Sequence, residues 1–201
     1  METLERFREF KSEVEKLMQE HPELFYTENN FAESNEARVN QGISLEFDLI
    51  EMIPHHPTCE KCAILQDRIY SISGKDKRFP PLSMVYEEGT NRVHKGCKHT
   101  FCLWAEMMYT PEEIEEAIKR SNRPFVDDRT QEQKDMYDQM QYYVFKRYMD
   151  NLYYNKLKEI LPNIVPKTLA GYRRMKNENT ANYKKLVQKA ADFGLDIDKY
   201  R

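Results

Sequence analysis

The residues best suited to chemistry in this chain are cysteines and histidines near its middle. Cys59 and Cys62 are separated by two residues, a spacing that lets two thiolates bind one ion while backbone amides face the sulfurs. Further along the chain, Cys97 lies between His94 and His99. Three cysteines and one histidine form a common tetrahedral ligand set of structural zinc sites, which leaves no open position for catalysis. We therefore predict one Zn²⁺ ion, held by these three cysteines and one histidine.

The spacing around Cys97 favours one of the two histidines. Cys97 and His99 are two residues apart, and residues two apart face the same side of an extended segment. His99 is therefore the predicted fourth ligand, and His94 is the alternative ligand. Cys102 alternates with apolar neighbours and reads as a small core residue.

Disulfide bonds and free or redox-active thiols are the alternatives to zinc binding by these cysteines. Four cysteines allow three disulfide pairings, but residues 1–6 show no basic region leading into an apolar stretch. The absence of that secretory pattern predicts a reducing compartment, where disulfides are disfavoured. Free or redox-active cysteines are the third interpretation, although the flanking sequence lacks the βαβ pattern of thioredoxin-like motifs.

Composition and charge describe a globular protein with two different ends. Charged residues make up 32% of the 201 residues and hydrophobic residues 40%, and no apolar run approaches the roughly 20 residues that span a bilayer. We therefore expect no membrane partner. Residues 1–36 carry ten Glu against four Lys or Arg, whereas residues 156–189 carry nine Lys or Arg against two Glu. This asymmetry indicates either two different partners or two solvated helix faces.

The first half of the chain predicts helices followed by short strands. Apolar residues recur at helical spacing over residues 2–20, and His21-Pro22 is expected to end that helix. A second helix is predicted over residues 31–41, stopped by Gly42. Alternating apolar residues predict a strand over residues 43–50, and short strands are predicted at 68–72 and 100–104. Residues 73–78 read as a polar loop. The stretch between Cys62 and Cys97 is poor in continuous apolar segments, so it would need a metal to become rigid.

The second half of the chain predicts helices. Thr110, Pro111 and Glu113 give a capping box with proline at the first helical position. Longer helices are predicted from Thr130 to about residue 161, then at 168–176 and 180–193, with Gly194 as a C-terminal cap. The predicted apolar side of the long helix comprises Met136, Met140, Tyr143, Val144, Tyr148, Leu152, Leu157 and Ile160.

These elements predict an α+β fold in three parts. Residues 1–42 form an N-terminal helical segment, residues 43–109 form a small zinc-clipped β/loop module, and residues 110–201 form a C-terminal helical region. Basic residues of the last part are candidates for nucleic-acid or partner contacts: Arg173, Arg174, Lys176, Lys184 and Lys185. A smaller basic cluster surrounds the central loop: Arg68, Lys75, Lys77 and Arg78. For the C-terminal residues, the alternative is that the interleaved Tyr172 and Tyr183 pack in the core and the lysines are simply solvated.

Several segments resemble tailed-phage minor capsid proteins of the head-morphogenesis group. The segments are His55–Ala63, Gln66–Pro80 and His94–His99, followed by Ser121–Phe125 with Asp128-Arg129, and preceded by Glu36–Gly42. In that family a Cys-x-x-Cys segment precedes a Tyr-Ser-Ile-Ser-Gly-Lys stretch, and a His-Pro-Asn-Cys-Arg-His knuckle closes the module. Some relatives carry cysteine where this chain has His99, as an exchange between zinc ligands would produce.

The resemblance implies a non-enzymatic structural protein of the virion. Its location would be the phage head, near the portal, and the host cytoplasm before assembly. Its implied partners are the portal and major capsid proteins and packaged double-stranded DNA, with no small-molecule substrate. Two alternatives remain: a zinc-containing nucleic-acid-binding protein, and a His-metal nuclease. The nuclease layout normally needs two histidines, and no histidine follows His99, so we expect no enzyme activity.

Overall fold

The computed structural model describes residues 2–20, 31–86, 93–94 and 97–201. Helices and a three-stranded antiparallel sheet give the α+β fold that the sequence predicts. The chain divides into two compact units, residues 15–139 with the sheet, and residues 1–14 together with 140–201. This division groups the start of the first helix with the last helices, and the predicted parts met at residues 42 and 109. Nowhere in the described part of the chain does a helix combine the length and the apolar character needed to cross a membrane.

The sheet places β1 (Leu49–Met52) between two antiparallel neighbours, β2 (Arg68–Ser71) and β3 (Phe101–Leu103). Ile50 lies opposite both Tyr70 and Leu103. The two outer strands were predicted within a residue or two. The strand predicted from Ile43 is wrong, because Ile43 still belongs to a helix and is 60% exposed. The apolar alternation before residue 49 therefore does not reflect a half-buried strand.

Helix α3 (Phe31–Ser44) continues through Gly42, where the sequence predicted a stop. A Cβ atom at Gly42 would lie 2.8 Å from Ile72 Cδ1 and 2.9 Å from Leu103 Cδ2. The glycine thus allows the helix to approach the sheet closely.

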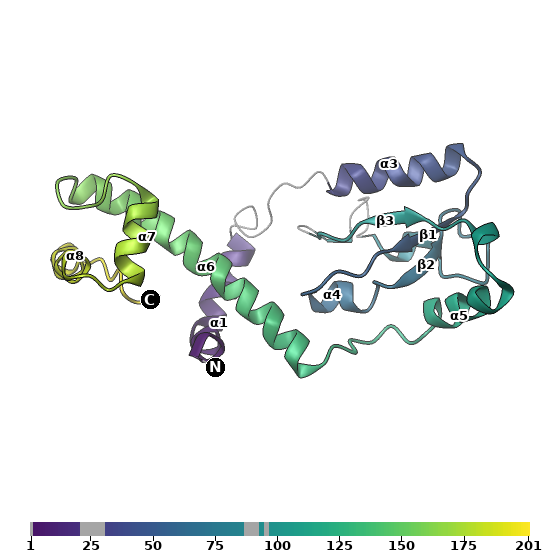
Figure 1. The fold of residues 1–201 in the computed structure, drawn as a ribbon, viewed down its shortest axis with the longest axis horizontal. Helices are drawn as coiled ribbons and strands as arrows, with labels where there is room; N and C mark the ends of the chain where they lie inside the picture. Colours follow the sequence, from purple (N-terminus) through teal and green to yellow (C-terminus); the bar gives the residue numbers. More distant parts are fainter. Residues whose placement is uncertain (1, 21–30, 87–92, 95–96) are drawn as a thin grey trace. The chain divides into compact units, whose positions relative to one another are not determined.

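Two helices cover opposite faces of the sheet (Figure 1). On one face, Val39 of α3 packs with the buried side chains of Ile50 and Phe101. On the other, Ala117 of α5 (Pro111–Ser121) packs with Leu49, Ile69 and Trp104. The α5 N-terminus has the predicted capping box, formed by Thr110 and Glu113. Three short elements complete this unit: α4 (Glu60–Ala63), η1 (Leu82–Met84) and η2 (Glu106–Met108).

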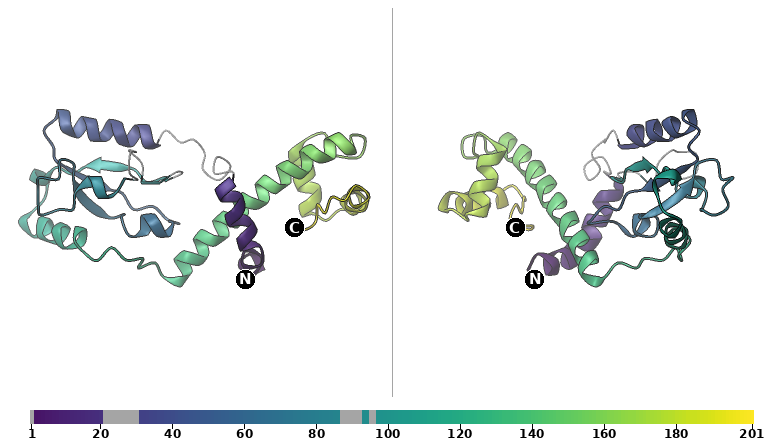
Figure 2. Two further views of the ribbon diagram at one scale, coloured as in Figure 1. Left: turned by 180° about the vertical axis from the view of Figure 1, so that it is seen from behind. Right: turned by 45° about the vertical axis from the view of Figure 1, so that its right-hand side comes forward.

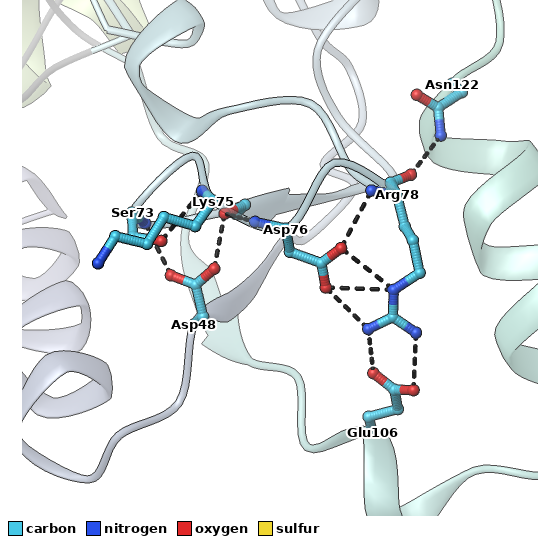
Figure 3. A network of polar contacts seen from close by, with 8 residues as sticks. Asp48, Ser73, Lys75, Asp76, Arg78, Glu106 and Asn122 are labelled. Carbon is cyan, nitrogen blue, oxygen red and sulfur yellow. Dashed lines mark hydrogen bonds and ion pairs between the residues drawn. The ribbon is translucent and has the colours of Figure 1, made fainter.

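The predicted polar loop at residues 73–78 is fixed by a network of charged contacts (Figure 3). The Asp48 carboxylate accepts hydrogen bonds from Ser71 Oγ and the Ser73 backbone N–H, both at 2.7 Å. The Arg78 guanidinium binds Asp76 and, at 2.8 and 2.6 Å, both oxygens of Glu106. These ion pairs tie the loop to the segment after β3, so the loop is held in one conformation.

The other unit is built from the start of α1 (Glu2–Glu20), most of α6 (Gln131–Ile160), α7 (Leu169–Asn177) and α8 (Ala181–Ala191). All four helices were predicted, and Gly194 follows α8 with a φ of 71°, as expected for a C-terminal cap. The predicted stop at His21-Pro22 lies outside the described residues.

The buried side of α6 differs from the predicted one. Leu157 is the member of the predicted set that is fully buried, whereas Tyr143 is 55% exposed and Met136 is 49% exposed. The buried side comprises Gln141, Tyr142, Phe145, Met149, Asp150, Tyr153, Tyr154 and Leu157. Aromatic residues occur all around this helix, so apolar periodicity alone did not select the side that packs.

Candidate metal centre

The first pair of thiols is positioned by a single turn of helix. Cys59 immediately precedes α4 and Cys62 lies within it. The turn closes where the Ala63 backbone N–H donates to the Cys59 carbonyl, 2.9 Å between N and O. Arg129 donates to the Thr58 carbonyl at 2.7 Å and so fixes the residue before Cys59.

The second set of donors lies on the segment that leads into β3. The Cys97 N–H donates to the His94 carbonyl at 3.1 Å, which turns the chain between these two residues. Asn35 of α3 then holds the next stretch, donating to the His99 carbonyl at 2.9 Å and accepting from the Phe101 N–H at 3.1 Å. A buried helix side chain thereby sets the position of the segment. The intervening Lys95 and Gly96 lie outside the described residues.

The donor atoms gather into two overlapping groups that could hold a metal ion. In the first, His94 Nε2 lies 3.2 Å from the Cys59 sulfur and 3.0 Å from the Cys62 sulfur. In the second, the Cys97 sulfur lies 3.6 Å from the Cys62 sulfur and 3.5 Å from His99 Nδ1. Cys62 belongs to both groups, so all five predicted side chains meet in one cluster.

Hydrogen bonding within the cluster favours thiolates at its two outer cysteines. Contact with the Cys62 thiol lowers the pKa of both neighbours, to about 5 for Cys97 and, with a further contact to His94, to about 4 for Cys59. The same contacts raise the pKa of Cys62, which retains the shared proton. Since thiolates are the form of cysteine that binds metals, the cluster favours metal binding.

Gln66 determines which nitrogen of His99 faces the sulfurs. Its Oε1 atom accepts a hydrogen bond from the His55 backbone N–H at 3.0 Å, which identifies it as the oxygen of the amide. The same oxygen lies 2.7 Å from His99 Nε2. Because an amide oxygen can only accept a hydrogen bond, Nε2 must carry the proton of the imidazole. His99 Nδ1 is left with a lone pair beside Cys97, and ligating histidines usually donate their other N–H in this way.

The donor set fits a thiophilic metal ion. A tetrahedral ion bound to sulfur at about 2.3 Å separates neighbouring sulfurs by roughly 3.8 Å, close to the 3.6 Å between Cys62 and Cys97. The donors are thiols and imidazoles in both groups, and thiolate and imidazole donors suit zinc better than magnesium or calcium. The set leaves one histidine beyond the four ligands that zinc normally takes.

Sequence reasoning found the donors but missed the residues that position them. Asn35, Gln66 and Arg129 are polar side chains outside the cysteine–histidine pattern, and they act by contacts across more than thirty residues of sequence. Their signal is burial of a polar group, which sequence does not reveal. Cys102 lies apart from the cluster, with its sulfur 4.0 Å from Glu51 Oε2.

The predicted basic contact residues fall into two sets. Lys176 is 2% exposed and its ammonium lies 2.8 Å from the Asp150 carboxylate, so it is not a surface contact residue. Arg173 also binds inward, to Asp150 and the Arg147 carbonyl. Arg174, Lys184 and Lys185 are exposed.

The smaller basic cluster around the central loop does not form a free surface either. Arg68 is 1% exposed and donates to the backbone carbonyls of Ile64 and Pro124. Arg78 is paired with Asp76 and Glu106. Lys75 and Lys77 are exposed like Arg78, but they do not share its ion pairs with Asp76 and Glu106.

Comparison with known proteins gives no relative. No protein-family model matches this chain, and no curated protein or solved structure matches it significantly.

Proposed function

We propose that the cluster binds one structural Zn²⁺ ion through Cys59, Cys62, Cys97 and His99. The lone pair that Gln66 leaves on His99 Nδ1 supports this choice of histidine. His94 Nε2 then donates its N–H to the sulfurs of Cys59 and Cys62. The metal would supply no chemistry beyond cross-linking α4 to the segment before β3, because four protein ligands fill its coordination shell.

We further propose that the chain is a non-enzymatic structural protein of a tailed-phage head, placed near the portal. One observation carries this proposal: the segments that resemble head-morphogenesis proteins pack against one another around the cluster. Arg68 binds the backbone carbonyls of Ser121 and Arg123, and Arg129 binds that of Thr58. Those contacts join segments that lie more than fifty residues apart in the sequence. The resemblance therefore covers one packed module.

Particle assembly tests this role directly. The chain would be expressed with the portal and major capsid proteins encoded in the same genome, and the purified particles would be examined by mass spectrometry. We expect the chain in particles that contain portal and its absence from particles made without portal. A folded, zinc-loaded chain that stays out of both kinds of particle would refute the head role and leave the metal proposal intact.

A nuclease assay tests the enzyme alternative. The intact zinc-loaded protein should leave supercoiled plasmid DNA uncut in the presence of Mg²⁺ or Mn²⁺. Cleavage that His94→Ala abolishes without loss of the fold would replace the structural role with a catalytic one.

A further inference from the structure

Helices α7 and α8 are joined by a tight turn that sets one helix across the other. The turn comprises residues 178–180, and its middle residue, Asn179, has a φ of 49°, in the left-handed region. Thr180 then caps α8 by accepting a hydrogen bond from the Tyr183 N–H at 3.1 Å. In Figure 1, α8 is seen nearly end-on while α7 lies across the view, and the two remain adjacent in Figure 2. Two helices connected in this way form a helix-turn-helix.

The inner face of α7 packs between α6 and α8, which gives this unit a small helical core. Tyr172 of α7 is fully buried between Tyr154 of α6 and Tyr183 of α8, with ring centroids 5.9 and 6.4 Å away. The buried ion pair between Lys176 and Asp150 also fastens α7 to α6. This arrangement holds α7 between α6 and α8, whereas the side chains on the outer face of α8 are exposed.

The outer face of α8 is basic and polar. Its exposed side chains, apart from alanines, are Asn182, Lys184, Lys185, Gln188 and Lys189. The sequence of α8 contains no acidic residue. Among the described residues, none forms an ion pair with a lysine of α8, whereas Arg174 of α7 is paired with Glu178. Positive charge on α8 is therefore not paired with an acidic side chain among the residues that the structure describes.

We propose that α7 and α8 form a DNA-binding helix-turn-helix whose second helix, α8, lies in the major groove of duplex DNA. The major groove admits one α-helix, and amide side chains such as Asn182 and Gln188 can form paired hydrogen bonds with adenine. Lys184 and Lys189, on the two flanks of the face, neutralise phosphates. This inference does not depend on the metal centre or on the proposed role in the phage head.

The chemistry of the face favours DNA over an acidic protein surface. The centres of protein–protein interfaces are enriched in aromatic residues and methionine, and lysine is depleted there. No large apolar side chain of α8 is exposed, because Tyr183 and Leu186 are buried inward and Val187 is half-buried. Lysines with interspersed amides instead suit a polar, negatively charged groove.

Fluorescence anisotropy with the full-length, zinc-loaded protein tests the proposal. The probe is a labelled DNA duplex of about three helical turns, selected for binding from a random-sequence pool. The double variant Lys184→Gln/Lys189→Gln should weaken binding at least about tenfold near 50 mM salt. It should also lower the slope of log K against log salt by about 1.8, the contribution of two phosphate contacts. Asn182→Ala/Gln188→Ala should reduce preference for the selected sequence while leaving the salt slope unchanged.

The matched control removes two exposed lysines elsewhere. Lys16→Gln/Lys119→Gln takes the same charge from α1 and α5, and it should leave DNA affinity within about twofold, since neither residue belongs to the proposed DNA-binding helix. Circular dichroism confirms that each variant is folded. The proposal is overturned by an absence of duplex binding at low salt, or by equal losses in the control. Equal competition from polyglutamate at the same charge concentration would also overturn it and identify an acidic protein as the partner.

Discussion

Cys62 is the sulfur that both donor groups share, 3.0 Å from His94 Nε2 and 3.6 Å from the Cys97 sulfur. Its neighbours Cys59 and Cys97 each reach a different histidine. Loss of any of the three thiols would therefore open the proposed coordination shell, from which Cys102 lies apart. Replacing each of the four cysteines by serine changes a single atom, so Cys102 can serve as the control for the other three.

We expect Cys59→Ser, Cys62→Ser and Cys97→Ser each to remove most of the roughly 10 kcal/mol that structural zinc contributes to folding. Each variant should lose bound zinc, measured by elemental analysis, and most of its soluble yield. Cys102→Ser is the control and should retain zinc and melt close to the parent protein. Damage of equal size in all four would show that the cysteines act by packing.

The two histidines should respond differently to replacement. His99→Ala removes the proposed ligand and should abolish stoichiometric zinc, whereas His94→Ala removes only an N–H donor to two sulfurs. Second-sphere losses of that kind cost about 10- to 100-fold in metal affinity. Competition with a chromogenic chelator measures both variants. The reverse order of effects would make His94 the ligand and His99 the supporting residue.

Arg68 connects three elements through backbone carbonyls. Its guanidinium donates to Ile64 after α4, to Ser121 at the end of α5, and to Arg123 and Pro124 beyond it. It also lies 3.9 Å from the centre of the Phe125 ring. A helix leaves its last carbonyls without intrahelical partners, and here one buried side chain from β2 satisfies them.

We expect Arg68→Leu to lower the free energy of unfolding by about 3 kcal/mol or more, because several buried carbonyls lose their donors at once. Urea denaturation of the zinc-loaded protein measures the change. Arg38→Leu is the control, since Arg38 is exposed on α3 and bonds only to Gln41 among the described residues. Its effect should stay within about 0.5 kcal/mol. Equal effects would show that the carbonyl contacts of Arg68 do not stabilise the fold.

At the scale of the whole molecule, the ends of the chain fold together. Phe10 of α1 packs edge-on against Tyr200, with ring centroids 5.0 Å apart, and Lys199 pairs with Glu13 at 2.8 Å. Phe145 of α6 contacts the same Tyr200 ring. All these residues belong to the helical unit, and every candidate metal ligand belongs to the other unit.

Removing the metal should therefore affect the two units unequally. With a strong chelator, we expect backbone amides of β1, β2 and β3 to lose protection from hydrogen exchange, while those of α7 and α8 keep theirs. Mass spectrometry of peptides from the intact chain measures both regions. Cys62→Ser without chelator should reproduce the pattern. Loss of protection throughout the chain would mean that the units fold as one.

The sequence by itself determined the donors of the metal centre, two of the three strands and nearly all the helices. These features depend on local information: Cys-x-x-Cys spacing, the Thr110 capping box and helical periodicity act within a few residues. Tertiary structure decided the rest. Gly42 sits inside a helix because Ile72 and Leu103 approach it, and Asp150 makes Lys176 a buried residue rather than a surface contact. Gln66 similarly sets the tautomer of His99 from thirty-three positions away. Each of these outcomes depends on a neighbour distant in the chain, which no local pattern specifies.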